Sequence, residues 1–357
     1  MKFTFKPEFK AIPVGTESQF HVLTTFSLPS SVENVSSQRT PISMALVIDR
    51  SGSMNGDKLT QTRNAICEII HSLTRRDRLA IICFDDQVDI VSEIGLLTEK
   101  NLITGKAKSI SAGGSTNLSG GWLEGLDQIE ANLDPAHINR VFLLTDGQAN
   151  CGVTAPEALV KIGESFCAKG ITTSTFGFGH GFNERLLSDI AAKSGGNFYF
   201  IQKPEDVSNA FRCEFGEVLD LAAQNCRISI ELAKNVKLCE DLSLFPSSQK
   251  DGKITWSVGD LAPELDYELV FRLKTLPNSA TDLQNLFKIN SVYKEISNDF
   301  KTTRTNAVAS IKLINDHKNI EADEEAIDRI VLAKCHKARQ LAYLELEKGQ
   351  FATAAKI

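Results

Sequence analysis

Residues 44–54, MALVIDRSGSM, join an apolar run to a row of oxygen-bearing side chains. The apolar run ends in Asp49, and Ser51 and Ser53 follow at alternate positions. A strand that is apolar throughout is typical of a parallel sheet covered on both faces. Its polar end therefore indicates a site at the edge of the sheet, which other parts of the chain must complete.

The pattern between residues 43 and 212 alternates between short apolar runs and segments with helical spacing. In the first helical segment, Leu59, Ile66 and Ile70 recur at intervals that place them on one face. Such alternation predicts an α/β fold with a doubly wound, mostly parallel sheet. The expected strands are 44–49, 78–84, 140–146, 171–179 and 197–201, and the expected helices are 57–73, 120–133, 155–170, 183–196 and 204–221.

The flanking segments have a different pattern, with strand-like alternation. Residues 1–42 are too short to fold alone, so we expect them to supply the N-terminal strands of a β-sandwich that residues 221–315 complete. The α/β domain, residues 43–220, would then be inserted into this all-β unit. Residues 316–357 read as a helical C-terminal segment, the start of a helical hairpin, with acidic residues early and cations later, as the helix dipole favours.

Composition limits the class of protein. The 357 residues exceed the ~250–300 of a single core. The net charge of -6 comes from well-mixed signs, without the basic stripe of a nucleic-acid binder. The N-terminus does not resemble a signal peptide, and no apolar run approaches the ~20 residues of a membrane span. The eight cysteines are scattered without CxxC pairs, which favours reduced thiols and a cytoplasmic location.

Three loops carry the candidate ligands of a metal ion. Asp49, Ser51 and Ser53 lie in the first, Thr116 lies in the glycine-rich stretch 111–121, and Asp146 directly follows a predicted strand. Loops after parallel strands gather at the carboxyl edge of the sheet, where ligands bind. Two carboxylates and three hydroxyls form a hard-oxygen set, which suits Mg²⁺, with Mn²⁺ or Ca²⁺ as alternatives, rather than zinc.

The number of ligands points to a role in binding. Two carboxylates only just balance a divalent cation, and hydroxyls are weak, neutral ligands. Water or an external anion would have to complete the shell. We therefore expect an Asp or Glu carboxylate of a partner protein to dock on the ion.

These residues resemble the metal-ion-dependent adhesion site of von Willebrand factor type A (VWA) domains, over roughly residues 43–212. The resemblance implies that Ser51 and Ser53 are direct ligands and that Thr116 is a direct or switching ligand. It also implies that Asp49 and Asp146 bind directly or through water. The flanking β segments are similar in layout to VWA proteins of the inter-α-trypsin inhibitor heavy chain and chloride-channel-accessory type.

The resemblance also bears on the last helix of the α/β domain, at 204–220. In VWA domains that act as switches, this helix moves when the metal site engages its ligand. Because it leads directly into the sandwich strands, a shift here would be transmitted to the β unit.

Two other functions use the same ion. A metal-dependent hydrolase is one, although the sequence has no P-loop, no HExxH and no nucleophile with an evident base, so we expect no enzyme activity. A scaffold whose metal only steadies the loops is the other.

Residues around the candidate ligands have simpler interpretations than binding or catalysis. The loop 176–183 follows a strand but lacks the glycine spacing of a dinucleotide site, and His180 within it is expected to be a lone surface histidine. Cys151 is expected to be an inert loop thiol, and Trp122 to pack a helix against the sheet. Arg50 lies between two ligands and could face an acidic group of a partner.

Overall fold

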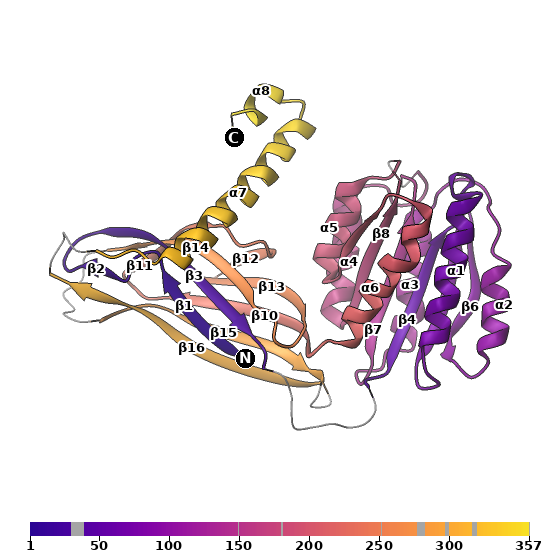
Figure 1. The fold of residues 1–357 in the computed structure, drawn as a ribbon, viewed down its shortest axis with the longest axis horizontal. Coiled ribbons are helices and arrows are strands. Elements are labelled where there is room, and N and C mark those ends of the chain that lie inside the picture. Colours follow the sequence, from indigo (N-terminus) through magenta and orange to yellow (C-terminus); the bar gives the residue numbers. More distant parts are fainter. Residues whose placement is uncertain are drawn as a thin grey trace.

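The computed structural model forms an α/β domain beside a β-sandwich, and a long C-terminal helix leaves the sandwich (Figure 1). In the part of the chain that it describes, no helix combines the length and the apolar character needed to cross a membrane. The described residues are 1–29, 39–148, 150–179, 181–250, 252–276, 283–296, 300–315 and 320–356.

The α/β domain is built on a sheet with the strand order β6-β5-β4-β7-β8-β9. Its neighbouring strands are parallel except for β6, which runs antiparallel to β5. Strand β4 lies inside the sheet and is buried along its whole length, as its apolar sequence predicts. The strands are β4 Ile42–Asp49, β5 Arg78–Phe84, β6 Val88–Leu96, β7 Ile138–Thr145, β8 Ile171–Phe178 and β9 Phe198–Ile201.

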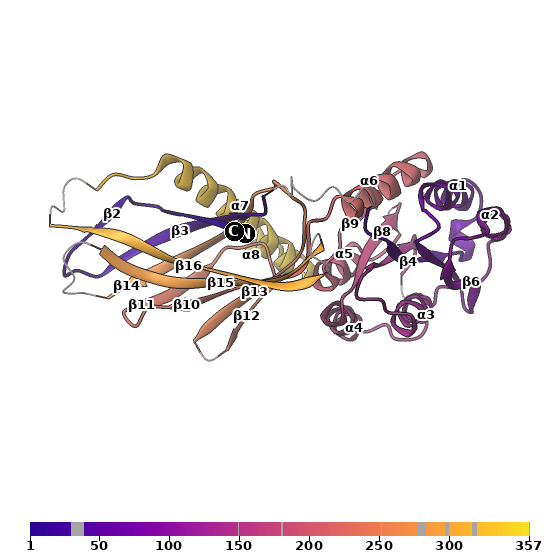
Figure 2. The same cartoon turned by 90° about the horizontal axis from the view of Figure 1, so that it is seen from below.

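Helices cover both faces of this sheet, with α1, α2 and α6 on one face and α3, α4 and α5 on the other (Figure 2). Helix α3 lies close to β4 because Gly125 has no side chain: a Cβ there would lie 2.3 Å from a methyl carbon of Val47. The helices are α1 Asp57–Ser72, α2 Lys100–Lys108, α3 Leu118–Ala131, α4 Pro156–Lys169, α5 Glu184–Ser194 and α6 Val207–Leu219, with short 3₁₀ turns at Gly52–Met54 and Pro204–Asp206.

The sequence pattern did not predict β6 or α2. Strand β6 lies at the edge of the sheet and its residues are exposed or half-buried, so its apolar positions do not form a buried run. Helix α2 buries only Ala107. Elements that bury little apolar surface leave a weak periodic signal in the sequence.

The sandwich consists of two sheets, with orders β1-β3-β14-β11 and β12-β13-β10-β15-β16-β2. The N-terminal segment contributes to both, since β3 pairs antiparallel with β14 and β2 pairs parallel with β16. The α/β domain is thus inserted into an all-β unit. The strands are β1 Lys2–Pro7, β2 Ala11–Pro13, β3 Ser18–Ser27, β10 Ala223–Leu232, β11 Val236–Asp241, β12 Ser247–Lys250, β13 Lys253–Leu261, β14 Tyr267–Thr275, β15 Leu283–Glu295 and β16 Lys301–Ile314.

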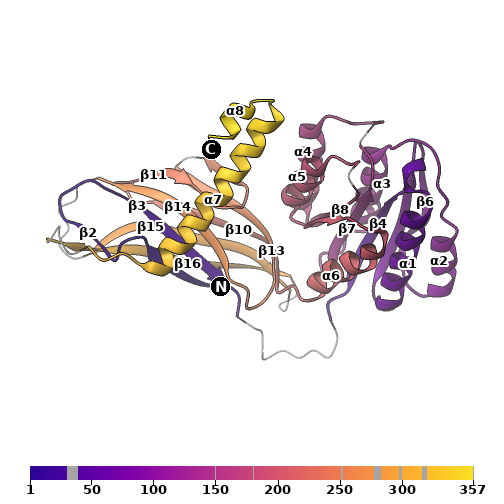
Figure 3. The ribbon, with the colours of Figure 1, turned by 45° about the horizontal axis from the view of Figure 1, so that its top comes forward.

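Helix α7, Glu324–Glu347, starts against the sandwich and then projects away from it (Figure 3). The Asp323 side chain caps its first turn by accepting a hydrogen bond from the Ala326 amide at 2.9 Å. Ala326 and Ile330 are buried against Leu23 and Val270 of the sandwich. The short helix α8, Phe351–Ala354, follows at the far end of α7.

A buried ion pair joins the two units. Arg140 of β7 donates to an oxygen of Asp260 of β13 at 2.6 Å, and the two side chains are only 3% and 8% exposed. The other oxygen of Asp260 accepts from the amide of Asn225 at 3.2 Å. Asn225 has a φ of 54°, at an irregularity in β10 that turns its amide toward this carboxylate. Removal of either charge would leave the other uncompensated in a dry environment.

We expect Asp260→Ala to lower the free energy of unfolding by about 3 kcal/mol because it leaves the buried Arg140 guanidinium without a counter-charge. The double variant Arg140→Met/Asp260→Leu should lose less than Asp260→Ala. Guanidinium denaturation followed by circular dichroism measures both. As a control, Asp189→Ala removes a pair whose side chains are both 52% exposed and should change little. Equal losses in the single and double variants would contradict the role of the buried charge.

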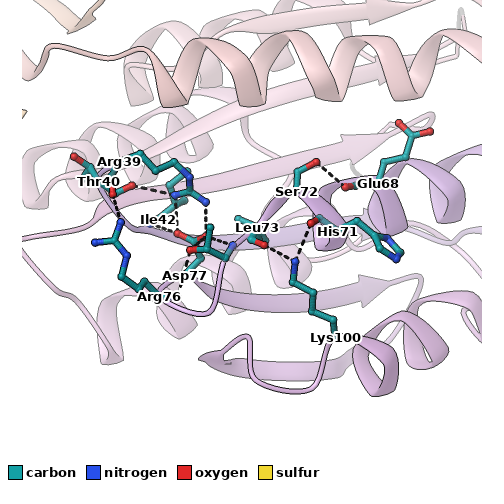
Figure 4. A network of polar contacts seen from close by, with 11 residues as sticks. Arg39, Thr40, Ile42, Glu68, His71, Ser72, Leu73, Arg76, Asp77 and Lys100 are labelled. Carbon is teal, nitrogen blue, oxygen red and sulfur yellow. Dashed lines mark hydrogen bonds and ion pairs between the residues drawn. The ribbon is translucent and has the colours of Figure 1, made fainter. Parts of the chain in front are cut away.

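A second polar network fixes the start of β4 (Figure 4). The buried Asp77 carboxylate accepts hydrogen bonds from the Arg39 guanidinium, from the Ile42 amide at 2.9 Å and from the Thr74 hydroxyl at 2.9 Å. Burial alone would raise the pKa of Asp77, but these donors outweigh it and hold the pKa below the ordinary value. The network therefore anchors the chain where it enters the sheet.

We expect Asp77→Asn to lower the free energy of unfolding by about 2 kcal/mol at neutral pH. Because the folded pKa is below the unfolded value of about 3.9, the stabilisation is complete above that value and is lost as the pH falls through the folded pKa. The difference between wild type and variant should therefore shrink on acidification from pH 7 to pH 3, in urea titrations. A difference that stays constant over this range would contradict the assignment.

Candidate metal centre

Three loops meet at the carboxyl edge of the sheet, where β4 and β7 end beside each other. The first and second loops are joined by the Gly52 amide, which donates to the Gly114 carbonyl at 2.9 Å. The second and third loops are joined by the Cys151 amide, which donates to the Thr116 carbonyl at 3.2 Å. These main-chain bonds hold the candidate ligands in one small region.

Asp49, at the end of β4, has a fully buried carboxylate that accepts two hydrogen bonds. One oxygen accepts from the Ser51 amide at 2.8 Å, and the other accepts from the Thr145 hydroxyl at 2.5 Å. Burial raises the pKa of Asp49, the charge of nearby Asp146 raises it further, and the two donors oppose the rise. A cation beside the two carboxylates would relieve their repulsion.

Ser51, Ser53 and Asp146 form a continuous chain of oxygens. The two serine hydroxyls lie 3.1 Å apart, and the Ser53 hydroxyl donates to an oxygen of Asp146 at 2.7 Å. Ser51 and Asp146 are buried, whereas Ser53 is exposed. The cluster therefore opens to solvent on the side of Ser53.

Thr116 is buried at the start of the segment that leads into α3. Its hydroxyl oxygen lies 3.1 Å from the position that a Cβ on Gly147 would take, so it faces the residue after Asp146. The structure thus places all five predicted residues at the same edge. Among the described residues, no group of three or more His, Cys, Asp or Glu side chains could hold a metal ion, so any site here depends on hydroxyls.

Arg50 differs from the expectation that it could face a partner, because it pairs with carboxylates of its own chain. Its Nε donates to Asp85 at 3.2 Å and its Nη2 to Asp89 at 2.5 Å. Asp85 also accepts from the Gly114 amide at 3.3 Å. Burial would raise the pKa of Asp85, but the Gln87 amide, Arg50 and Gly114 lower it overall. Arg50 thus holds the β5–β6 turn against the loops that carry the candidate ligands.

The sequence pattern did not identify two residues that contact the candidate ligands. The first is Thr145, whose hydroxyl orients Asp49. The second is Lys58 in the first turn of α1, whose ammonium donates to Asp146 at 2.5 Å. A cation near a helix N-terminus opposes the helix dipole, and this was the available signal that Lys58 has a specific partner.

The other neighbours lie as follows. Trp122 is fully buried and its indole donates to the Thr173 hydroxyl at 3.2 Å, so it packs α3 against the sheet. Cys151 is half-buried and contacts the site through its main chain. His180 lies outside the described residues.

The domain combines a doubly wound α/β sheet with an oxygen-rich cluster at its carboxyl edge. Comparison with known proteins identifies the class of protein that has these features. The family model for the von Willebrand factor type A domain matches residues 43–212. The chain therefore contains a VWA domain.

Two curated proteins are similar in sequence to part of this chain. An uncharacterized protein of Synechocystis sp. is 29% identical over 201 residues, which cover 56% of this chain and 47% of that protein. Human inter-alpha-trypsin inhibitor heavy chain H3 is 31% identical over 164 residues, 44% of this chain and 18% of the relative. The chain thus spans less than half the length of these relatives.

A solved structure extends the similarity of fold beyond the VWA domain. The von Willebrand factor type A protein of Catenulispora acidiphila superposes with a TM-score of 0.76 at 16% identity. The match covers 95% of this chain and 79% of that one, so it includes the sandwich.

We expect Thr145→Val to weaken divalent-cation binding about tenfold, because it removes the hydroxyl that orients Asp49 while it keeps the shape of the side chain. Calorimetric titration with MnCl₂ measures the change. Thr175→Val is the matched control, since it removes a buried hydroxyl in β8 that donates to the Leu187 carbonyl. An unchanged affinity in Thr145→Val would show that Asp49 needs no such support.

Proposed function

We propose that the VWA domain binds a divalent cation, Mg²⁺ in the first place, and docks a partner protein's Asp or Glu carboxylate on it. The proposed ligands are Asp49, Ser51, Ser53, Thr116 and Asp146. The observation that carries this proposal is the spacing of oxygens within the first loop and between the first and third loops. Neighbouring ligands around an octahedral Mg²⁺, each at about 2.1 Å from the ion, are about 3 Å apart. The 3.1 Å and 2.7 Å separations at Ser53 match this spacing.

The direction of access supports docking rather than a closed structural site. Asp49, Ser51 and Asp146 are buried on the inner side, while Ser53 is exposed. Hydroxyl ligands add no negative charge, so an ion held by two carboxylates keeps an affinity for a third. The remaining position is therefore suited to an anionic side chain from outside.

The same features argue against catalysis by this ion. Hydrolysis needs a positioned base or nucleophile. Cys151 contacts the candidate site through its main-chain amide, which donates to the Thr116 carbonyl. We therefore propose a binding module, with a metal-dependent hydrolase and a purely structural metal as the alternatives to be tested.

The setting of the domain is also a proposal. All eight cysteines are free, which supports a reducing, cytoplasmic environment. The mixed surface charge supports a protein partner rather than a nucleic acid. An adaptor role, with the sandwich and α7 as further contact surfaces, follows from these features.

We expect Ser51→Ala and Thr116→Ala each to weaken Mg²⁺ binding at least tenfold by calorimetry and to abolish metal-dependent capture of a partner. Capture from native lysate should be compared in MgCl₂ and in EDTA. Ser72→Ala, which removes an exposed hydroxyl at the end of α1, is the matched control and should behave as wild type.

The alternatives give different outcomes. If the metal is purely structural, the Ser51→Ala and Thr116→Ala proteins should melt at a lower temperature than wild type in Mg²⁺. Wild type should then capture no partner in a Mg²⁺-dependent manner. Capture that is the same with metal, with chelator and in both variants would refute docking on the ion.

A further inference from the structure

Lys58 makes two contacts at the candidate metal centre. Its ammonium nitrogen lies 2.5 Å from an oxygen of Asp146 and 5.5 Å from the centre of the Phe178 ring. The Asp146 carboxylate is fully buried, whereas the Lys58 side chain is 32% exposed. The lysine thus reaches inward from the rim of the site to a carboxylate that solvent does not reach.

The location of Lys58 makes this contact specific. It is the second residue of α1, where the positive end of the helix dipole disfavours a cation. The contact with Asp146 and the face of an aromatic ring offset that repulsion. Lys58 is therefore held at the site by Asp146 and Phe178 against the preference of its own helix.

The two oxygens of Asp146 are both engaged in this arrangement. One accepts from the Ser53 hydroxyl and the other accepts from Lys58. A divalent cation that takes Asp146 as a ligand competes with at least one of these donors. The Ser53 hydroxyl can remain as a fellow ligand, but a second positive charge cannot remain at the same carboxylate without repulsion.

The charge balance points the same way. Asp49 and Asp146 carry two negative charges, and Lys58 reduces the net charge of the cluster to one. Adding a divalent cation while Lys58 stays would make the cluster positive. Moving the ammonium out to solvent leaves it neutral, and the partial exposure of Lys58 makes that movement possible.

We propose that Lys58 is a tethered competitor of the metal ion: its ammonium and the divalent cation share Asp146, so that binding the ion expels the lysine. This inference rests on the proposed metal site and goes beyond it, because it assigns the strength of metal binding to a residue that is not a ligand. The consequence is a weaker affinity of the site for the ion. The occupancy of the site would therefore respond to changes in the concentration of the ion.

The test is calorimetric titration of the full chain with MgCl₂ and with MnCl₂. Lys58→Met keeps the length of the side chain and removes its charge, and it should bind both ions about tenfold more tightly, equivalent to about 1.4 kcal/mol. Lys58→Arg retains a cation and should stay near wild type. Lys161→Met, on the exposed side of α4, controls for the loss of one positive charge elsewhere in the domain.

Melting curves give an independent readout and a check of folding. In EDTA, Lys58→Met should melt below wild type, because Asp146 has lost its counter-charge. In excess MnCl₂ it should gain more in melting temperature than wild type does. If Lys58→Met does not fold, Lys58→Gln replaces it in both measurements.

The outcomes separate the inference from the proposed function. Tighter binding by Lys58→Met, with Lys58→Arg and Lys161→Met unchanged, supports the competition. Equal or weaker binding by Lys58→Met, with measurable binding by wild type, overturns the competition and leaves the metal site standing. Failure of wild type and every variant to bind either ion overturns the metal site and the competition with it.

Discussion

The burial of one carboxylate at the end of an interior strand is the constraint on which the domain depends. Asp49 is fully buried, so its charge is tolerated only because the Ser51 amide and the Thr145 hydroxyl donate to it. Both donors are positioned by neighbouring strands in the same sheet. The packing of β4 against β7 therefore determines the geometry of the site. A change in either strand would shift the oxygen atoms of the site.

Several features follow directly from the amino-acid pattern. The buried run before Asp49 predicted an interior strand, and the strand–helix alternation predicted a doubly wound sheet, which the fold confirms. Loops after parallel strands must gather at one edge, so the pattern also placed five oxygen-bearing residues together. Each of these predictions relies on local periodicity or on a general rule of topology.

Other features could not be predicted by such rules, because they depend on the directions of side chains that are far apart in sequence. Thr145 ends an apolar strand, and only the fold shows that its hydroxyl points at Asp49. Arg140 was a visible anomaly at the start of that strand, yet its partner Asp260 is 120 residues away in sequence. A charged residue in a buried strand predicts a partner without identifying it. Weakly buried β6 and α2 gave no clear periodic signal at all.

The arrangement of β7 suggests how the site relates to the rest of the molecule. Thr145 and Asp146 lie at its carboxyl end, while Arg140 contacts the sandwich near its other end. At about 3.3 Å per residue, these points are about 20 Å apart along one buried strand. Helix α6 ends on the sandwich side as well, where it leads into β10 (Figure 1).

Helix α6 is also tied to the sheet. Its buried Glu214 accepts hydrogen bonds from Ser174 at 2.5 Å, Asn197 at 2.9 Å and Tyr199 at 3.0 Å. A shift of α6 away from the sheet in response to ligand would have to break these bonds. The shift of the last helix stays a prediction, and this buried carboxylate opposes it. Arg140 of β7 and the chain that leads from α6 into β10 therefore both connect the α/β domain to the sandwich, and a shift of α6 would have to expose or re-pair Glu214.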